Sequence, residues 1–357
     1  MQLLKLAGVG VAALGGLIQS SPSTTPKSSG TSAAGAAASA DSPASKSSDP
    51  PKEPGSAPSN GGGGPYELVQ SHEGETFFDG WDFWSDADPT HGQVDYVPQD
   101  QARSAGLIST SSSVATMKVD SSSTLEAGAQ RQSVRIHSKE AVQIGSLIIA
   151  DIVKMPFGCA TWWMNGPNWP AGGEIDVLEG VHDFPANQIT LHVVDSGCKL
   201  SESADVTGKL VPANDDCNAN VKGNAGCSYA EQAANSYGKG FNDAGGGVFA
   251  TSFTADAIDQ WFWSRPDVPE NIKSGTPDEA GWGKPTASWP SSSCEISKCF
   301  ADQTMIFDTT LCGDWAGAVW EGECLEVAAT CADAVKDPKN FVDAVWEVAS
   351  VKVYSLG

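Results

Sequence analysis

The sequence predicts an all-β fold for most of the chain, an antiparallel β-sandwich of jelly-roll type. Runs of β-branched and aromatic residues recur along it and are separated by Gly, Pro, Asn and Ser. Many such strands with turn-rich connections are typical of two packed antiparallel sheets. We expect strands over residues 134–136, 143–153, 189–194, 247–253, 257–263, 304–309 and 345–354.

Composition divides the chain into three parts. Residues 1–20 contain one lysine and then an apolar run, which is short for a membrane span and typical of a secretory signal peptide. Residues 21–64 are only small, polar and charged residues and Pro, so we expect a disordered linker. Residues 65–357 hold every aromatic residue and are sufficient for one large β domain.

The excess of acidic residues belongs to the third part. The chain has 21 basic and 44 acidic residues, net −23. Four of the basic and three of the acidic residues lie before residue 65, which leaves 17 against 41, net −24. The negative electrostatic field of this part repels nucleic acid and anionic membranes, but it does not repel a neutral polymer. We therefore expect no nucleic-acid partner, no transmembrane segment in the mature chain, and a monomer.

All nine cysteines lie in the third part. Behind a signal peptide they predict disulfides with at least one thiol left over, and their pairing stays open. Their spacing does not form the CxxC pairs of a zinc site, and the chain has no phosphate loop, EF-hand or nucleophile-elbow motif. We expect no metal and no cofactor. The segment 197–247, rich in Cys, Gly and Asn, predicts surface loops.

The segment Gly173–Gly180, GEIDVLEG, contains three closely spaced carboxylates, Glu174, Asp176 and Glu179. In a strand successive side chains point to opposite faces, so the first two acids share one face. Strict alternation would place the third acid among the apolar residues. One extra residue absorbed at Val177–Leu178 as a β-bulge removes this conflict. With the bulge, all three acids face one way.

Carboxyl groups held at a fixed separation are the machinery that cleaves a glycosidic bond. Repulsion among three neighbouring carboxylates raises at least one pKa and keeps a proton available near neutral pH. The same residues would also suit a solvated acidic stretch, or the first turn of a short helix after Gly172-Gly173. The alternation of Ile and Val with the acids favours the strand, and with it catalysis.

An aromatic-rich loop, WWMNGPNWP over residues 162–170, precedes the acidic strand. With it the chain resembles the fungal laminarinase-type members of glycoside hydrolase family 16, whose signature is a Trp-rich loop followed by GEIDxxEG. The likeness covers residues 65–357. It extends to the segments 88–92, 133–136, 190–192, 235–238, 245–248, 307–310, 312–317 and 346–354.

The resemblance implies a jelly roll with a curved active-site cleft, and it implies roles for four residues. By it, Glu174 is the nucleophile, Asp176 is the hydrogen-bonding partner that tunes the nucleophile, and Glu179 is the acid/base. A retaining double displacement follows from these roles. His192 is similar to the family's active-site histidine, although a histidine satisfied within a strand is the alternative.

The resemblance also implies binding residues. Trp163, Trp169 and Trp315 are similar to sugar platforms, because the apolar faces of sugars pack on aromatic rings. Arg135 would donate hydrogen bonds to sugar hydroxyls, and a strand arginine paired within the protein is the alternative. Three further tryptophans are expected in the core instead: Trp261, Trp263 and Trp346.

Three functions remain under consideration. The favoured one is a secreted endo-β-1,3(4)-glucanase, extracellular or in the cell wall, that cleaves internal β-1,3 and mixed β-1,3/1,4 linkages of β-glucan. A cell-wall glucan transglycosylase of the same fold would differ in whether water or a sugar resolves the intermediate. A non-catalytic β-glucan-binding module is the third, and it usually lacks one of the two glutamates, both of which are present here.

Overall fold

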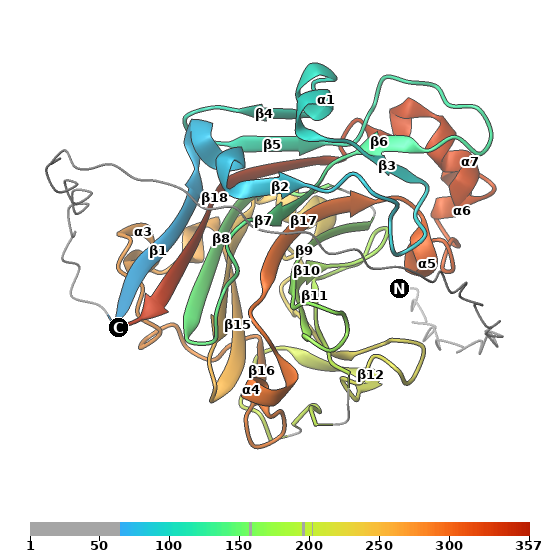
Figure 1. Cartoon of the computed structure of the whole chain (residues 1–357). Coiled ribbons are helices and arrows are strands. Elements are labelled where there is room, and N and C mark those ends of the chain that lie inside the picture. Colours follow the sequence, from blue (N-terminus) through green and yellow to red (C-terminus); the bar gives the residue numbers. More distant parts are fainter. Residues whose placement is uncertain (1–64, 157–158, 195–196, 202) are drawn as a thin grey trace, which may run out of the picture. The chain divides into compact units, whose positions relative to one another are not determined.

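A computed structural model of the chain describes residues 65–156, 159–194, 197–201 and 203–357 (Figure 1). The predicted signal peptide and linker lie outside these residues and stay predictions. Within the described ranges, no helix is long and apolar enough to cross a membrane.

Two large antiparallel sheets make up the fold (Figure 1). The first, called the β8 sheet, has the order β16 (Ala287–Pro290), β15 (Ala257–Ser264), β14 (Gly247–Phe253), β8 (Ser146–Lys154), β18 (Val345–Leu356), β5 (Ala115–Lys118) and β4 (Ile108–Thr110), with β1 (Tyr66–Glu73) also paired to β18. The second, called the β10 sheet, has the order β12 (Lys209–Asp215), β13 (Cys227–Ala230), β11 (Gln188–His192), β10 (Glu174–Glu179), β9 (Cys159–Asn165), β17 (Thr304–Thr310), β7 (Arg135–Ser138) and β2 (Trp81–Phe83).

The remaining elements are short. Strands β3 (Val94–Tyr96) and β6 (Arg131–Ser133) form a small parallel pair. The helices are α1 (Gln99–Ser104), α2 (Gly238–Asp243), α3 (Glu270–Lys273), α4 (Ile296–Cys299), α5 (Gly313–Ala316), α6 (Cys324–Val327) and α7 (Cys331–Lys336). Short 3₁₀ helices occur at Gly74–Gly80, Arg265–Asp267 and Pro338–Phe341.

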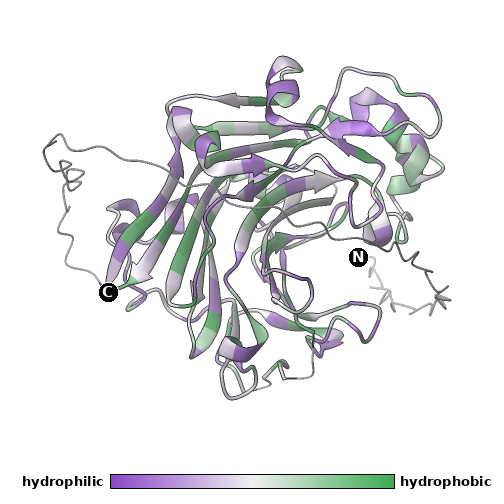
Figure 2. Ribbon diagram, in the orientation of Figure 1, coloured by the Kyte–Doolittle hydropathy of each residue, from purple (hydrophilic) through white to green (hydrophobic). Residues whose placement is uncertain are grey.

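The main core lies between the two sheets, as the alternation of side chains along a strand requires. It combines side chains of β8, such as Ile148 and Ile152, with side chains of β10, such as Ile175. Apolar residues accordingly recur along the strands of both sheets (Figure 2). Trp162 stacks on Phe307 at the centre, with ring centroids 4.3 Å apart. Burial of this apolar surface is the main force that holds the sheets together.

The predicted all-β sandwich is confirmed. All seven predicted strands are present, and β14 has the predicted bounds. The expectation of surface loops over residues 197–247 is wrong in part, because this segment contributes β12, β13 and α2. Its strands extend the β10 sheet at one edge. The residues of β12 and β13 show no regular alternation of apolar and polar side chains that would mark them as strands in the sequence.

Three disulfides form, as the cysteines predict: Cys198–Cys294, Cys217–Cys227 and Cys312–Cys331. The first two tie down the polar 197–247 segment, which has little core of its own. The third closes a loop of 19 residues that carries α5 and α6. Such crosslinks stabilise loop-rich segments by reducing the freedom of the unfolded chain.

Candidate active site

The three acids stand on β10, in the middle of the β10 sheet between β9 and β11. Pairing with β11 shifts register between Asp176 and Glu179, and pairing with β9 shifts between Asp176 and Leu178. This is the predicted β-bulge. The apolar side chains between the acids are all buried in the core, so the extra residue is absorbed on the core side. Glu179 thereby returns to the electrostatic neighbourhood of Glu174 and Asp176.

Asn187 holds the bulge in place. A bulge removes ladder partners from the backbone groups beside it. The fully buried Asn187 side chain replaces them: its Nδ2 donates to the carbonyl of Val177 at 2.7 Å, and its Oδ1 accepts from the N–H of Glu179 at 2.9 Å. Its own N–H donates to Ser236 Oγ at 2.9 Å. Sequence reasoning missed Asn187, since a lone Asn before a strand carries no motif.

His192 lies directly opposite Glu174 in the β10–β11 register. Its Nε2 is 3.4 Å from Asp176 Oδ2 and 4.0 Å from Glu174 Oε1. The other ring nitrogen, Nδ1, donates to Asn224 Oδ1 at 2.9 Å. Asn224 has φ 63, in the left-handed region that Asn tolerates better than most residues. This bond orients the ring and turns Nε2 toward the acids. Asn224 is a second site residue that the sequence did not single out.

Burial and mutual repulsion shift the titration of the three acids. Burial raises the pKa of Glu174 to about 8, with the charge of Asp176 as the second cause. Burial also raises the pKa of Asp176, which is 1% exposed. The pKa of Glu179 rises well above its usual value, first through burial and then through the charge of Asp176. The cluster therefore retains protons at neutral pH, as the sequence predicts.

Compensating interactions are unequal between the two glutamates. At Glu174, His192, a hydrogen bond from the Trp169 side chain and Arg135 all lower the pKa. At Glu179 the charge of His192 lowers the pKa, while burial and the charges of Asp176, Glu174 and Asp308 raise it. Glu174 therefore ionises more readily than Glu179. Two carboxyl groups whose pKa values are driven apart by their surroundings are suited to separate roles, one as an anion and one as an acid.

The structure brings two of the three predicted platforms to the acids. Trp163 pairs with Asp176 in the β9–β10 register, and Trp169 hydrogen-bonds to Glu174 with 46% of its surface exposed. Trp315 lies on α5, 36% exposed, where its ring meets Phe184 edge-on at 5.6 Å. Phe184 belongs to the loop between β10 and β11, so Trp315 stands beside the connection that leaves the acidic strand.

Arg135 is held by protein groups. Its side chain is 4% exposed; Nη1 lies 3.6 Å from Asp308 and 3.9 Å from Asp88, and Nε donates to His137 Nε2 at 2.9 Å. The rings of Trp84 and Trp163 each lie 5.2 Å from the guanidinium carbon. This geometry matches the alternative of an internally paired arginine. A hydrogen bond from Arg135 to a sugar stays a prediction.

Asp308 is a buried carboxyl group two strands away from Glu179 in the β10 sheet. On β17 it lies opposite both Arg135 and Thr161, and Thr161 in turn lies opposite Glu179. Burial raises the pKa of Asp308 to about 6, and the Tyr96 hydroxyl donates to it at 3.2 Å. Its charge raises the pKa of Asp176 and of Glu179. In the sequence, Asp308 is singled out only as part of the segment 307–310, which resembles the family, and no role is predicted for it.

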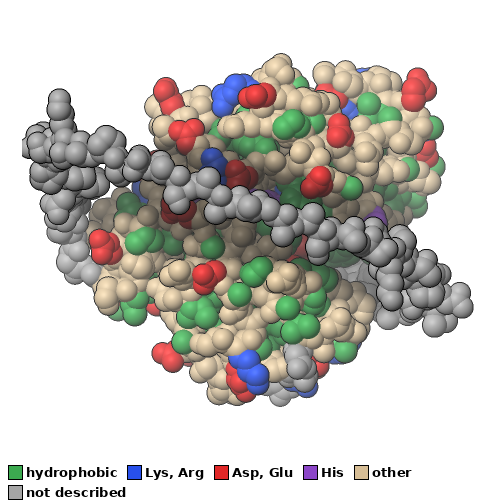
Figure 3. Space-filling model, viewed as in Figure 1, with side chains coloured by type: hydrophobic (Ala, Val, Ile, Leu, Met, Phe, Trp, Pro, Cys, Tyr) green, Lys and Arg blue, Asp and Glu red, His purple; other side chains and the backbone are tan. Residues whose placement is uncertain are grey.

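A hollow crosses the face of the molecule seen in Figure 3, with acidic and histidine side chains inside it. In Figure 1 the strands of the β10 sheet curve behind this hollow. Ligand atoms of Glu174, Asp176 and His192 lie within 4.8 Å of one another, a spacing that a cation also accepts. The sequence specifies no cation, and the expectation of no metal stays a prediction. Two glutamates on one strand beside this hollow suit glycoside hydrolysis.

Comparison with known proteins identifies the family. The model of the XgeA-like catalytic domain of glycoside hydrolase family 16 matches residues 81–354. A probable glycosidase of Schizosaccharomyces pombe is 40% identical over 294 residues, 81% of this chain and 69% of that protein. An endo-1,3(4)-beta-glucanase of Arthroderma benhamiae is 39% identical, over 83% of this chain and 66% of that protein. A probable endo-1,3(4)-beta-glucanase of Aspergillus fumigatus is 41% identical, but the match spans only 46% of its length.

Solved structures agree with this assignment. One is laminarinase 16A of family 16 from Phanerochaete chrysosporium, a structure with two beta-glucans in both donor and acceptor sites. It is 37% identical to this chain, with a TM-score of 0.75, and the match covers 81% of this chain and 99% of that chain. An elongating family 16 beta-1,3-glucosyltransferase has a TM-score of 0.73 and 36% identity over 81% of this chain and 100% of that chain. This chain belongs to glycoside hydrolase family 16 and carries its XgeA-like catalytic domain.

Proposed function

We propose that the protein is a retaining endo-β-1,3(4)-glucanase that hydrolyses internal β-1,3 and mixed β-1,3/1,4 linkages of a β-glucan. The observation that carries the proposal is the bulged strand β10, which gathers Glu174 and Glu179 in one electrostatic cluster but gives them unequal surroundings. Relatives named endo-1,3(4)-beta-glucanase support the substrate class. Several of those relatives are much longer than this chain, so the proposal concerns the domain described above.

In the first chemical step, Glu174 attacks the anomeric carbon and Glu179 donates its proton to the leaving glycosidic oxygen. Glu174 is the better anion, because more of its neighbours stabilise negative charge. Glu179 holds its proton more tightly and so arrives at the reaction as an acid. In the second step, the ionised Glu179 takes a proton from water, which attacks the glycosyl–enzyme bond and frees Glu174.

Asp176 and His192 position the nucleophile in this scheme. Asp176 hydrogen-bonds to Glu174, and His192 Nε2 approaches both carboxyl groups. When Glu174 forms the covalent bond it loses its negative charge, and the hydrogen shared between the two carboxyl groups then stays on Asp176. Trp163 and Trp169, and Trp315 further along the chain, supply flat apolar surfaces for sugar rings.

The direct test is incubation with laminarin and lichenan, followed by analysis of the products over time. We expect both polymers to fall quickly to short oligosaccharides, the pattern of internal cleavage. Release of glucose alone, with the polymer length maintained, would contradict an endo mode. Absence of product from both polymers, with the protein folded, would contradict the proposal itself.

A transglycosylase is the second candidate, because one structural neighbour is described as an elongating beta-1,3-glucosyltransferase. The two activities differ only in the acceptor that resolves the glycosyl–enzyme bond. Incubation with laminaripentaose at high concentration separates them: a transglycosylase forms products longer than the substrate, whereas a hydrolase forms shorter ones. The third candidate, a non-catalytic glucan-binding module, has less support, because both glutamates and their partners are assembled.

Secretion to the cell exterior or wall is part of the proposal. Three disulfides form in the structure, and such bonds persist in oxidising compartments. The apolar N-terminal run is consistent with export. Recovery from the culture medium of a mature protein that lacks about the first 20 residues would support this location. Retention of the whole chain inside the cell would contradict it.

A further inference from the structure

A second aromatic surface lies at the edge of the β8 sheet, away from β10. Trp261 and Trp263 alternate on β15, so their rings share one side of the strand; they are parallel within 6°, with centroids 6.5 Å apart. Trp282 meets both rings edge-on, at 5.4 and 5.0 Å. Trp261 is 7% exposed, as a core residue should be. Trp263, also expected in the core, is partly buried and packs against the same core cluster as Trp261 and Trp282.

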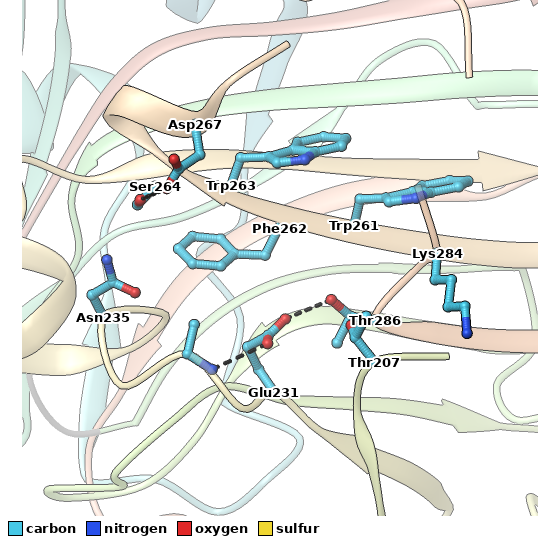
Figure 4. A pocket seen from close by; sticks show the side chains of 11 residues that line it. Thr207, Glu231, Asn235, Trp261, Phe262, Trp263, Ser264, Asp267, Lys284 and Thr286 are labelled. Atoms are coloured by element: carbon cyan, nitrogen blue, oxygen red, sulfur yellow. Dashed lines mark hydrogen bonds between the residues drawn. The ribbon is translucent and has the colours of Figure 1, made fainter. Parts of the chain in front are cut away.

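Trp263 lines two cavities. One, of about 330 Å³, lies between the end of β15 and the chain segments next to β12, β13 and β16, and is shown in Figure 4. The other, of about 470 Å³, lies against Trp282 and α3. Asp267 is the other residue common to both. Trp263 therefore borders both cavities, and Thr207 and Asn235 also line the first one.

The first cavity occupies an open edge of the β8 sheet. Strand β16 pairs with β15 only from Ala257 to Gln260, and the Thr286 N–H completes this edge by donating to the Gln260 carbonyl at 2.7 Å. No described strand pairs with this edge beyond that point. Since backbone groups alternate along a strand, those of Phe262 point to the same open edge. The cavity thus offers main-chain donor and acceptor groups beside the indole.

The charged side chains around the cavity are already engaged. Glu231 accepts from the Thr286 hydroxyl and from the backbone N–H groups that follow it. Asp267 accepts from Ser264 Oγ at 2.7 Å, and Lys284 lies 2.6 Å from Asp205. Among the described residues, the Trp263 indole N–H has no hydrogen-bond partner. What remains available is neutral: an indole face with its N–H, a hydroxyl, an amide and the main chain.

We propose that this surface is an accessory glucan-binding site, in which a glucosyl unit of a β-glucan stacks on Trp263 while its hydroxyl groups bond to Asn235, Thr207 and the β15 edge. A neutral polyol fits because flat sugar faces pack on indoles and hydroxyl groups satisfy neutral donors and acceptors. The site rests on the proposed function for its ligand. Glu174, Asp176 and Glu179 are not among the residues that line the two cavities, so the site can hold a polysaccharide without occupying the catalytic acids.

The test uses the full mature chain made inactive by Glu174→Gln, mixed with curdlan, an insoluble β-1,3-glucan, and sedimented. Adding Trp263→Ala should weaken binding roughly tenfold, because a stacked aromatic ring is lost. Leu325→Ala, at a residue 55% exposed on α6, is the matched control. Added to the Glu174→Gln protein, it should leave binding to curdlan unchanged. In a chain with Glu174 intact, Trp263→Ala should lower the ratio of the rate on curdlan to the rate on laminaritetraose.

The proposal would be overturned if the Glu174→Gln protein bound curdlan equally well with and without Trp263→Ala, and the variant was folded. Trp263 packs on Trp261 and Trp282, so a second variant guards against misfolding: Asn235→Ala leaves the aromatic packing in place and should weaken binding about threefold. If Trp263→Ala does not fold, unchanged binding by Asn235→Ala overturns the site. Trp263-dependent binding by a wild-type chain that hydrolyses neither laminarin nor lichenan would contradict the glucanase function alone, and leave the site standing.

Discussion

At the scale of single residues, Glu174 and Glu179 show how one functional group acquires two roles. Both are carboxyl groups on one strand, and burial raises the pKa of each. His192, Trp169 and Arg135 favour the anion of Glu174, whereas the negative charges of Asp176, Glu174 and Asp308 oppose the anion of Glu179. On the proposed assignment, environment rather than residue type separates the nucleophile from the acid.

Glu174→Gln and Glu179→Gln should each lower hydrolysis of laminarin at least about a hundredfold while the protein stays folded, because each removes a distinct chemical step. Azide tells the two roles apart with an activated substrate. It should restore turnover to Glu179→Ala with the same anomer as the natural product, and to Glu174→Ala with the opposite anomer. Nearly full activity in either Gln variant would contradict the assignment.

The raised pKa values also predict how stability depends on pH. The ordinary pKa of Glu174 is 4.5 and its folded pKa is about 8, so the folded state binds a proton that the unfolded state has lost in this window. Stability should therefore fall as pH rises from about 4.5 to about 8. Glu174→Gln should flatten the decline of Tm over that range, while Asp82→Asn, at an exposed residue of β2, should not. Parallel Tm profiles for wild type and Glu174→Gln would exclude the buried proton.

The sequence was sufficient to predict that the three acids lie together, but not which groups support them. Glu174, Asp176 and Glu179 share one short motif, so their spacing alone indicates a common face. Asn187 and Asn224 reach the site from connecting segments, through contacts that only the fold creates. Polar residues in loops are common, and no local pattern distinguishes these two from the others.

At the scale of elements, the bulge in β10 is the feature on which the site depends. Without it, Glu179 would point into the core between the sheets. Its position could be predicted because the acids break the alternation of the strand at one place. The strands β12 and β13 could not be predicted in the same way. Their chain is held by disulfides and main-chain pairing as well as by a few buried side chains such as Tyr229, and it lacks a repeated apolar pattern.

Asn187→Ala should destabilise the fold by about 2–4 kcal/mol, because it leaves two buried backbone groups at the bulge without partners. It should also lower kcat, since Glu179 loses the bond that fixes its backbone. Asn220→Ala, at an exposed residue with a single hydrogen bond to Val194, is the control and should cost less than about 1 kcal/mol. Urea unfolding and laminarin hydrolysis measure the two effects. A loss of stability no larger than that of Asn220→Ala would show that the bulge does not need Asn187.

At the scale of the whole molecule, the sandwich supplies a rigid base for the site. The β10 sheet presents its acids on one face and buries its apolar side chains against the β8 sheet on the other. The same packing leaves the β8 sheet with an open edge at β15, where the accessory site is proposed. One fold thus offers two separate surfaces to a polymer, one for cleavage and one for attachment.

A protein that begins at Pro65 should be as active on laminarin as the mature chain, and its Tm should agree within about 2 °C. The reason lies in composition: residues 21–64 contain no large apolar side chain that could add to the core. Calorimetry of the two proteins side by side measures the difference. A markedly lower Tm for the shorter protein would show that the predicted linker packs against the domain.

The stereochemistry of hydrolysis tests the central claim most directly, namely that Glu174 and Glu179 act as nucleophile and acid/base from one bulged strand. Such a pair suits the separation of about 5–5.5 Å in retaining enzymes better than the gap of about 6.5–9.5 Å that admits water in inverting ones. Proton NMR of the anomeric region, recorded in the first minutes of laminarin hydrolysis before mutarotation, identifies the first product. We predict the β-anomer. An initial α-anomer would contradict both the nucleophilic role of Glu174 and the geometry proposed for the pair.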